Sequence, residues 1–323
     1  MTVMEQAAQA IRALALDEVL KDQVAADPAL RKLAWRVAER YVGGQSVPEA
    51  LARAALLNAE GKPVSLDYMG ESCRDAGLAT AETEVFLDLS RQAAARGTNC
   101  SVSLDLSHIG SVVDRELGLA NATRLAEATA AAGQEMMISA EGSDRTDLIL
   151  WTHEHLCERF DHVGVTIQAR LHRTAEDLAR LLRRPGRIRL VKGSFFESES
   201  IAHPRDSHEL RAAYLAYATL LLDSGHLCSI ATHDLDLLDE LQRHMRRDSG
   251  TYEVEILLGL GVDQLRTMRD RGHPVREYIV FGTQWWLYVC NRIAEDPARL
   301  FQALVDATRH GGHPASDQVT RAE

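Results

Sequence analysis

Eight short apolar runs alternate with longer amphipathic stretches over roughly 240 residues from Pro63 onward, and this alternation restricts the fold more than any other feature. Most of the runs are rich in β-branched or aromatic residues and are bounded by polar residues or glycine, which is typical of buried strands. The expected strands are Val64–Asp67, Cys100–Leu106, Met136–Ser139, Val163–Ala169, Ile188–Val191, Cys228–Thr232, Tyr252–Leu257 and Tyr278–Phe281.

The stretches between these runs predict amphipathic helices, among them Thr80–Arg96, Glu116–Ala132, Thr174–Arg184, Ser207–Ser224 and Asp234–Arg246. Strands that alternate with helices are joined by right-handed crossovers and form a parallel sheet. Eight such units predict an α/β protein with a closed (β/α)8 barrel. An open, doubly wound sheet is the structural alternative, but no glycine-rich GxGxxG turn follows the first strand.

The sequence before the barrel is helical in character, because Ala, Leu, Glu and Arg dominate it up to about residue 60. We therefore expect an N-terminal helical segment at residues 1–60 and a barrel domain at 61–310. The last residues, 311–323, are polar and predict a flexible tail.

Composition excludes several classes of partner. The net charge of −11 disfavours nucleic acid and anionic membranes, since both need a basic surface. The five cysteines are odd in number and form no CxxC pair, which favours free thiols in a reducing cytoplasm. The start of the sequence lacks a basic region of the signal-peptide kind, and no apolar run approaches the ~20 residues that span a bilayer. We expect a cytoplasmic protein without an integral membrane segment.

The stretch 277–295 predicts a strand followed by a helix that begins near Thr283. On that helix Tyr288, Asn291, Arg292 and Glu295 stand at offsets 0, 3, 4 and 7, which places them on one face. Such a face suits a small zwitterion, with Arg292 on the acid and Glu295 on the ammonium group. The alternative is a solvated helix face that carries an ion pair between residues three apart.

Polar residues gather where the predicted strands end. In a barrel the carboxyl ends of the strands carry the chemistry. Arg189 stands among apolar neighbours and needs a partner, so a buried ion pair inside the barrel is the alternative to a catalytic role. The polar residues in or after the strands are Asp67, Glu71, Ser103, Asp105, Ser139, Glu141, Gln168, Arg170, Arg189, Lys192, Thr232, His233, Asp234, Glu253, Glu255 and Tyr278.

Metal sites are not expected. His153, His155 and Cys157 stand two residues apart, so on a helix they point to nearly opposite sides and do not share one ion. The ATHD run at 231–234 is compatible with a metal hydrolase barrel, but the predicted strands 1, 3 and 5 carry no paired histidine motif.

Six motifs in order resemble the flavin-dependent proline dehydrogenase family in its monofunctional bacterial form. They are SLDYMGES at 65–72, IQARLHRTAEDL at 167–178, RLVKGSFFES at 189–198, ATHD at 231–234, YEVEILLGL at 252–260 and the strand and helix at 278–295. The resemblance implies a distorted barrel preceded by helices, bound FAD, and hydride transfer from the carbon next to a substrate nitrogen to flavin N5.

The resemblance also assigns residues to the two parts of the site. Those implied to bind FAD are Gln168, Arg189, Lys192, Gly193, Thr232, His233 and Glu253. Those expected to line the catalytic pocket are Ser103, Ser139, Arg189, Tyr278, Tyr288, Asn291, Arg292 and Glu295.

Four pocket positions depart from the family pattern. Asn291 replaces the first of two adjacent arginines, Ser103 a lysine, Ser139 an aspartate and Phe195 a tyrosine. One arm of a carboxylate clamp is lost, so we expect a different amine as substrate, such as a modified proline, another substituted amine or a hydrazine derivative. Authentic L-proline oxidation and a non-catalytic binding role are the alternatives. The expected partners are a small-molecule amine and an electron acceptor, either a quinone or oxygen.

Overall fold

The structure, a computed structural model, describes residues 2–70 and 72–308. The chain forms two compact units, which are described separately: residues 43–283 make one, and residues up to 42 together with those from 284 make the other. The predicted boundaries at residues 60 and 310 stay a prediction, and the compact units divide the chain at different points. Glu71 and the predicted tail at 311–323 lie outside the described residues.

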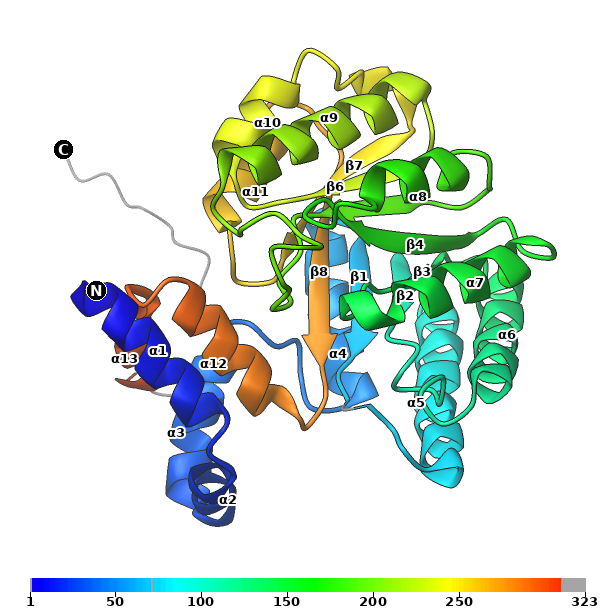
Figure 1. The fold of residues 1–323 in the computed structure, drawn as a ribbon. Helices are drawn as coiled ribbons and strands as arrows, with labels where there is room; N and C mark the ends of the chain where they lie inside the picture. Colours follow the sequence, from blue (N-terminus) through cyan, green and yellow to red (C-terminus); the bar gives the residue numbers. More distant parts are fainter. Residues whose placement is uncertain (1, 71, 309–323) are drawn as a thin grey trace. The chain divides into compact units, whose positions relative to one another are not determined.

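The larger unit is a closed barrel of parallel strands in sequence order, which confirms the predicted (β/α)8 architecture (Figure 1). Every neighbouring pair is parallel, including the closing pair of the first and last strands. Within its described part the strands are β1 (Val64–Tyr68), β2 (Cys100–Leu104), β3 (Met136–Ile138), β4 (Val163–Gln168), β5 (Ile188–Val191), β6 (Cys228–Ala231), β7 (Tyr252–Leu257) and β8 (Val275–Phe281).

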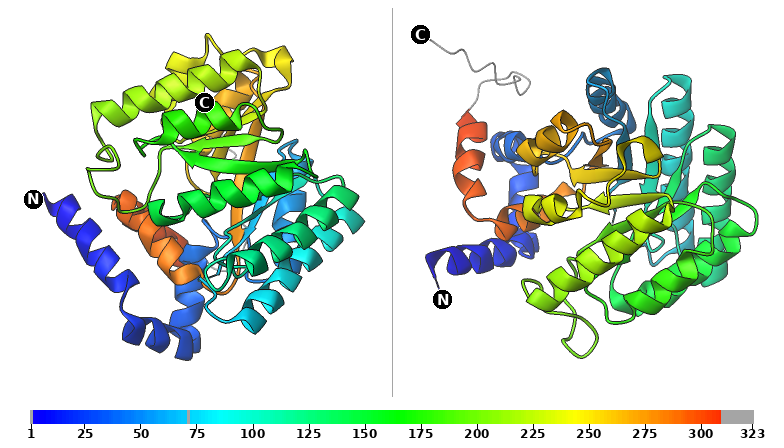
Figure 2. Two further views of the ribbon diagram at one scale, coloured as in Figure 1. Left: turned by 45° about the vertical axis from the view of Figure 1, so that its right-hand side comes forward. Right: turned by 90° about the horizontal axis from the view of Figure 1, so that it is seen from above.

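Helices surround these strands, as Figures 1 and 2 show. They are α4 (Val47–Ala59), α5 (Ala76–Ala95), α6 (Arg115–Ala131), α7 (Thr146–Cys157), α8 (Thr174–Leu181), α9 (His208–Ser224), α10 (Leu235–Leu241) and α11 (Val262–Asp270), with short 3-10 turns η1 (Ser143–Arg145) and η2 (Arg247–Ser249). Some predicted bounds were wrong by three residues or more, beyond the usual uncertainty of element ends; α5 begins four residues before the predicted Thr80, and α8 ends three residues before Arg184. Strand β8 begins three residues before Tyr278, and α10 ends five residues before Arg246.

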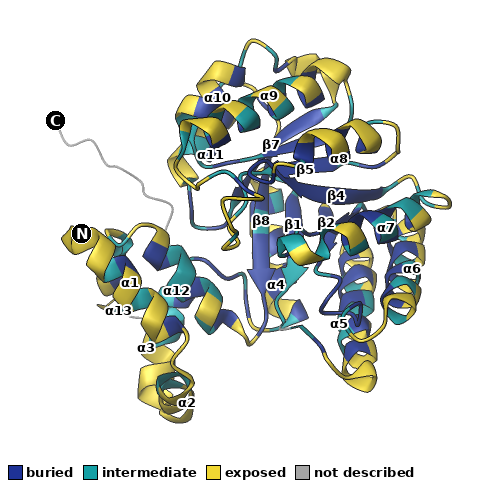
Figure 3. Ribbon diagram, in the orientation of Figure 1, coloured by how far each residue is buried: buried dark blue, intermediate teal, exposed yellow. Residues whose placement is uncertain are grey.

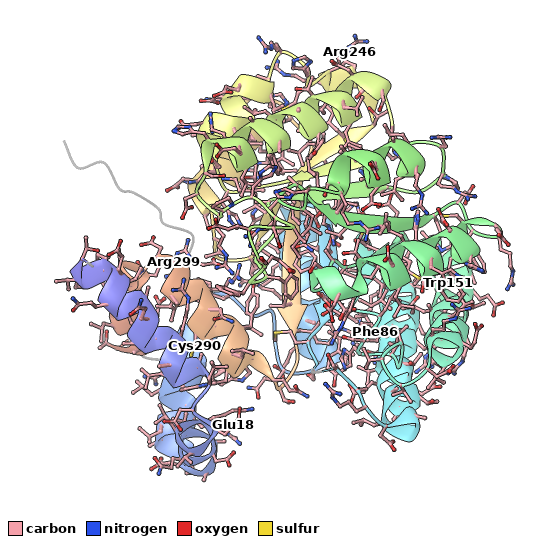
Figure 4. The ribbon with its side chains drawn as sticks, viewed as in Figure 1. Glu18, Phe86, Trp151, Arg246, Cys290 and Arg299 are labelled. Atoms are coloured by element: carbon pink, nitrogen blue, oxygen red, sulfur yellow. The ribbon has the colours of Figure 1, made fainter. Side chains whose placement is uncertain are left out.

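Alternate strand residues build two different interiors. The outward-facing residues, such as Leu66, Val102 and Val165, are fully buried in the apolar layer between strands and helices. Phe86 of α5, which Figure 4 labels, belongs to the same layer. The inward-facing residues are largely polar, and most of them are buried, in agreement with the dark blue strands in Figure 3. The centre of the barrel is a network of hydrogen bonds and ion pairs.

The smaller unit is helical. It contains α1 (Val3–Ala15), α2 (Glu18–Ala26), α3 (Pro28–Ala38), α12 (Trp285–Glu295) and α13 (Arg299–Thr308). Trp35 and Trp285 meet edge to face at 5.7 Å, and Arg40 Nη2 donates to Asp306 Oδ1 at 2.8 Å. Helix α12 begins two residues after the predicted Thr283, and its first residue is preceded by a cap that makes no side-chain hydrogen bond.

Among the described residues, the helices are all too short or too polar to cross a bilayer. The cysteines of the described chain are free thiols.

Candidate active site

The carboxyl ends of the barrel strands bring several predicted site residues to one rim. Asp67 ends the inward face of β1, Asp105 and Ser139 directly follow the ends of β2 and β3, and Gln168 ends β4. Tyr278 of β8 is paired in register with Ser65 of β1, so its ring stands beside Asp67. We call this set the barrel mouth: Asp67, Asp105, Ser139, Gln168 and Tyr278.

Arg189 lies inside the barrel beneath the mouth. Its Nε donates to Glu255 Oε2 at 2.6 Å and its Nη2 to Glu255 Oε1 at 3.0 Å. Nη2 also donates to Ser103 Oγ at 3.1 Å and to Ser65 Oγ at 3.2 Å, and the guanidinium carbon lies 4.7 Å from the centre of the Tyr278 ring. The buried ion pair considered for Arg189 is therefore present, with Glu255 as the partner. Its place beside a flavin stays a prediction.

Tyr278 donates its hydroxyl to Asp67 Oδ2 in a short hydrogen bond. Burial raises the pKa of Asp67 to about 7, although the Tyr278 hydroxyl and the Arg189 charge act in the opposite direction. The pKa of the tyrosine is raised well above its usual value by burial and by the neighbouring carboxyl. One proton is therefore held tightly between these two groups near neutral pH.

Asp105 is a member of the mouth that the family resemblance assigns neither to FAD nor to the pocket. Burial raises its pKa well above the usual value, and repulsion by Asp67 and Glu141 adds to this shift. Its inward orientation could be predicted from the sequence, because Ser103 stands two residues earlier on the same inward face of the strand. The sequence could not show that Glu141 lies close to Asp105. Glu141 accepts the backbone N–H of Ser107 at 3.0 Å and pairs with the guanidinium of Arg145.

Gln168 and Gly193 suit a planar group that hydrogen-bonds through its edge. Among the described residues Gln168 Oε1 is buried without a hydrogen-bond partner, while its Nε2 donates to Glu141 O at 2.9 Å. Gly193 has φ +104°, and a Cβ there would stand 2.8 Å from the Arg170 side chain and 2.9 Å from Gln168 Oε1. An unmet buried acceptor beside bare backbone fits the N–H edge of an isoalloxazine ring.

The neighbouring residues assigned to FAD by resemblance lie after β5 and β6. Lys192 Nζ pairs with Asp234 Oδ2 at 2.8 Å. Thr232 Oγ1 accepts the backbone N–H of Asp234 at 3.1 Å, and His233 Nε2 accepts that of Leu257 at 3.4 Å. These contacts connect the carboxyl ends of β5, β6 and β7 next to Gly193.

Glu253 does not reach the mouth. It stands two residues before Glu255 in β7, toward the amino ends of the strands. There Arg276 Nε donates to Glu253 Oε1 at 2.7 Å, and Ser229 Oγ donates to the same atom at 2.7 Å. Burial opposes its ionisation, but Arg276 and Arg187 outweigh burial and lower its pKa. The structure therefore places Glu253 in a supporting layer apart from the other residues assigned to FAD.

Four predicted substrate residues belong to the helical unit, on α12. Arg292 Nη2 pairs with Glu295 Oε1 at 2.6 Å, and the Arg292 guanidinium lies 5.3 Å from the centre of the Tyr288 ring. The ion pair between residues three apart, which the sequence offered as the alternative to a zwitterion site, is therefore present on this helix. The role of the four residues toward a substrate stays a prediction.

On α7, His153 and Cys157 contact each other, contrary to the predicted opposite sides, whereas His155 faces a backbone carbonyl. His153 Nε2 lies 3.2 Å from Val163 O and 3.3 Å from Cys157 Sγ, while His155 Nδ1 faces Trp151 O. Burial lowers the pKa of His153 to about 4 and raises that of Cys157 to about 11. In the described chain, no three His, Cys, Asp or Glu side chains gather as a cation site would require.

A parallel (β/α)8 barrel with ionisable and hydrogen-bonding side chains at the carboxyl ends of its strands is the arrangement of a barrel enzyme. The sequence profile described as proline dehydrogenase matches residues 50–288. A proline dehydrogenase from Deinococcus radiodurans is 30% identical over 286 residues, which cover 85% of this chain and 92% of the relative. Proline dehydrogenase 1 of Bacillus subtilis is 28% identical over 264 residues, 81% of this chain and 87% of the relative.

The chain belongs to the proline dehydrogenase family, and it is an FAD-dependent oxidoreductase that acts on a CH–NH bond. This membership favours an enzyme over the non-catalytic binding role considered from the sequence. Proline utilization A from Bdellovibrio bacteriovorus has the same fold, with a TM-score of 0.77 and 18% identity. That comparison covers 87% of this chain, which spans about a third (35%) of the solved chain.

Proposed function

We propose that this protein dehydrogenates a substituted amine at the carbon next to its nitrogen and forms an imine or hydrazone-like product. The substrate is a modified proline, another substituted amine or a hydrazine derivative. Bound FAD supplies the hydride acceptor of this reaction. The protein must hold the reacting C–H bond in place, exclude water and keep the nitrogen unprotonated when the bond breaks.

The observation that supports this proposal most is that Gln168 and Gly193 lie close together at the barrel mouth, near the buried charge of Arg189. Gln168 Oε1 is a buried acceptor, and Gly193 leaves backbone open beside it. Arg189 is fixed by Glu255, so its positive charge is preorganised to stabilise negative charge that develops at the mouth. We assign Gln168 and Gly193 to the ring edge and Arg189 to electrostatic stabilisation.

Substitutions in the pocket support a substrate other than free proline. Ser103 and Ser139 are short and neutral where the resembled family has a lysine and an aspartate, and Asn291 stands in place of an arginine. A second arginine would bind a carboxylate through two parallel hydrogen bonds, and an asparagine does not replace that charge. Free α-amino acids therefore lose affinity relative to amines whose acid group is modified or missing.

Authentic L-proline dehydrogenation to 1-pyrroline-5-carboxylate is the second candidate. Its support is the naming of the relatives, several of which are proline dehydrogenases that match more than four fifths of this chain. In that case the remaining Arg292 would carry the carboxylate alone.

An anaerobic flavin-bleaching screen separates these candidates. The FAD-loaded protein is mixed with L-proline, N-substituted prolines, cyclic secondary amines and alkyl hydrazines, and absorbance near 450 nm is followed. We expect a substituted amine or hydrazine to bleach the flavin faster than L-proline at equal concentration. Bleaching by L-proline above every other compound would establish the second candidate and refute the first.

A gain-of-function variant tests the pocket argument. Combining Ser103→Lys, Ser139→Asp and Asn291→Arg restores the charges of the resembled pocket, so L-proline turnover is expected to rise. The matched control is Ser139→Ala in the original background, which changes size without adding charge. A triple variant that folds and binds FAD but gains no proline turnover would show that these positions do not set substrate choice. Reoxidation by a soluble quinone and by oxygen, compared side by side, identifies the electron acceptor.

A further inference from the structure

We propose that Asp105, together with Asp67, forms a recognition site for an organic ammonium group, so that the substrate is bound through its positive nitrogen and needs no carboxylate. The inference rests on the proposed amine chemistry and names its substrate class as small cationic amines of the pyrrolidinium kind.

The two carboxyl groups stand where a ligand can reach them. Asp67 and Asp105 are half-buried at the carboxyl ends of β1 and β2, whereas Ser103 and Ser139 are buried. The strands are neighbours in register, with Asp67 paired to Ser103, so Asp105 lies one inward position further toward the rim. Both carboxyls therefore face the opening rather than the core.

The cations nearest to these carboxyls are paired with other carboxylates. Arg189 is engaged by Glu255, and Arg145 is engaged by Glu141. Among the described residues no salt bridge within 4.0 Å joins a Lys, Arg or His to Asp67 or Asp105, and the two carboxyls repel each other. A partly desolvated pair of carboxyls without a counter-charge is stabilised by a bound cation.

An independent observation points to a ligand at the same place. Ser139 is more than nine-tenths buried, and its hydroxyl faces the Asp105 carboxyl and the Tyr278 hydroxyl. Within the described chain it makes no well-formed hydrogen bond. An ammonium group carries two or three N–H donors, and its positive charge favours the ionised form of Asp67 and Asp105, so that the two carboxylates and this hydroxyl accept the donors together. A carboxylate ligand would instead meet repulsion from Asp67, Asp105 and Glu141.

Binding of small probes to the FAD-loaded protein tests the site. The flavin is first reduced with dithionite, so that an amine binds without being oxidised, and dissociation constants are measured by calorimetry at pH 7. The probes are pyrrolidine, which is a cation without a carboxylate, and tetrahydrofuran-2-carboxylate, which is a carboxylate without a nitrogen. We expect pyrrolidine to bind more tightly than the ether acid.

Variants connect that affinity to Asp105. Asp105→Asn keeps the shape but removes the charge, and it is expected to weaken pyrrolidine binding by about tenfold to a hundredfold, the loss of a hydrogen bond to a charged group. Asp105→Glu keeps the charge and should lose less. The control is Asp144→Asn, which changes an exposed acid on η1 and is expected to leave the dissociation constant unchanged.

Equal pyrrolidine affinity in the Asp105→Asn variant, or preference for the ether acid, would overturn the site. The binding experiment and the flavin-bleaching screen can fail independently of each other. Bleaching by amines together with binding that ignores Asp105 refutes the ammonium site and leaves the reaction standing. Asp105-dependent binding without bleaching by any amine supports the site and refutes the reaction.

Discussion

Glu255→Gln is the change that most directly tests the buried ion pair at the centre of the barrel. The side chains of Arg189 and Glu255 are 5% and 2% exposed, and two hydrogen bonds of 2.6 and 3.0 Å join them. Glutamine has the same shape but no charge, so the guanidinium stays buried without its counter-ion. Removing one partner of such a pair costs about 3–5 kcal/mol.

The lower end of that range applies here, because the glutamine oxygen still accepts one hydrogen bond and the serines around Arg189 accept others. A loss of about 3 kcal/mol corresponds to a fall in Tm of about 6–12 °C for a unit of this size. Unfolding is followed by circular dichroism at one saturating FAD concentration. Trp151, labelled in Figure 4, is the one tryptophan in the sequence between residues 43 and 283, so its fluorescence also contributes a signal from the barrel unit.

The surface pair of Arg124 and Glu84 provides the control, since both side chains are largely exposed. Glu84→Gln removes a charge from that pair and is expected to change stability by less than about 1 kcal/mol. A double variant, Arg189→Met with Glu255→Gln, should be less destabilised than the sum of its two single changes, because it removes the unpaired charge. Strict additivity, or a Glu255→Gln protein as stable as the original, would refute this account of the barrel centre.

Other predictions concern the mouth and its loop. Gly193→Ala is expected to weaken FAD binding and to destabilise the fold by about 1–3 kcal/mol, because a Cβ would meet Arg170 at a positive φ. Gly61 also has a positive φ, of +78°, but open space surrounds it, so Gly61→Ala should leave FAD affinity unchanged in a fluorescence titration. Glu197 accepts the backbone N–H of Ser143 at 2.8 Å, so Glu197→Ala should speed proteolysis of the loop after β5, while Glu199→Ala should not, as mass spectrometry of the fragments would show. The folded protein holds the Asp67 proton up to a pKa of about 7, above the unfolded value of about 4, so stability falls as pH rises through that window. Asp67→Asn should flatten this slope in urea titrations, and an unchanged slope would assign it to another group.

Local sequence was enough to predict the barrel, because each strand and helix carries its own periodicity. The strand at Ile188–Val191 was predicted with its observed bounds, and Tyr252–Leu257 likewise. Strand β8 begins three residues before the predicted Tyr278 and includes Arg276, whose buried guanidinium donates to Glu253 on β7 and to Val64 O. A charged residue can occupy a barrel interior when a residue far away in the sequence neutralises it, and a single sequence does not show which residues come close in space.

Residue types at strand ends could be predicted from the sequence, but their neighbours could not. The alternation of side chains places Ser103 and Asp105 on one inward face, and nothing in the chain order says that Glu255 rather than Glu253 meets Arg189. Which glutamate meets Arg189 depends on the position of each residue along the barrel axis, and that position follows from the stagger between the strands. Glu253 was assigned to FAD through the resemblance of YEVEILLGL, and the structure pairs it with Arg276 near the amino ends.

The sequence by itself determined the number and order of the strands, the acidic character of the protein, and the motifs that identify its family. Tertiary structure decided which buried charges neutralise one another and which carboxyls lie at the barrel mouth. It also joined α12 to the N-terminal helices, where the indole of Trp286 donates to Leu14 O across 272 positions of the chain. The physical reason is that periodicity is a property of neighbouring residues, whereas charge pairing depends on distances that only the folded chain creates.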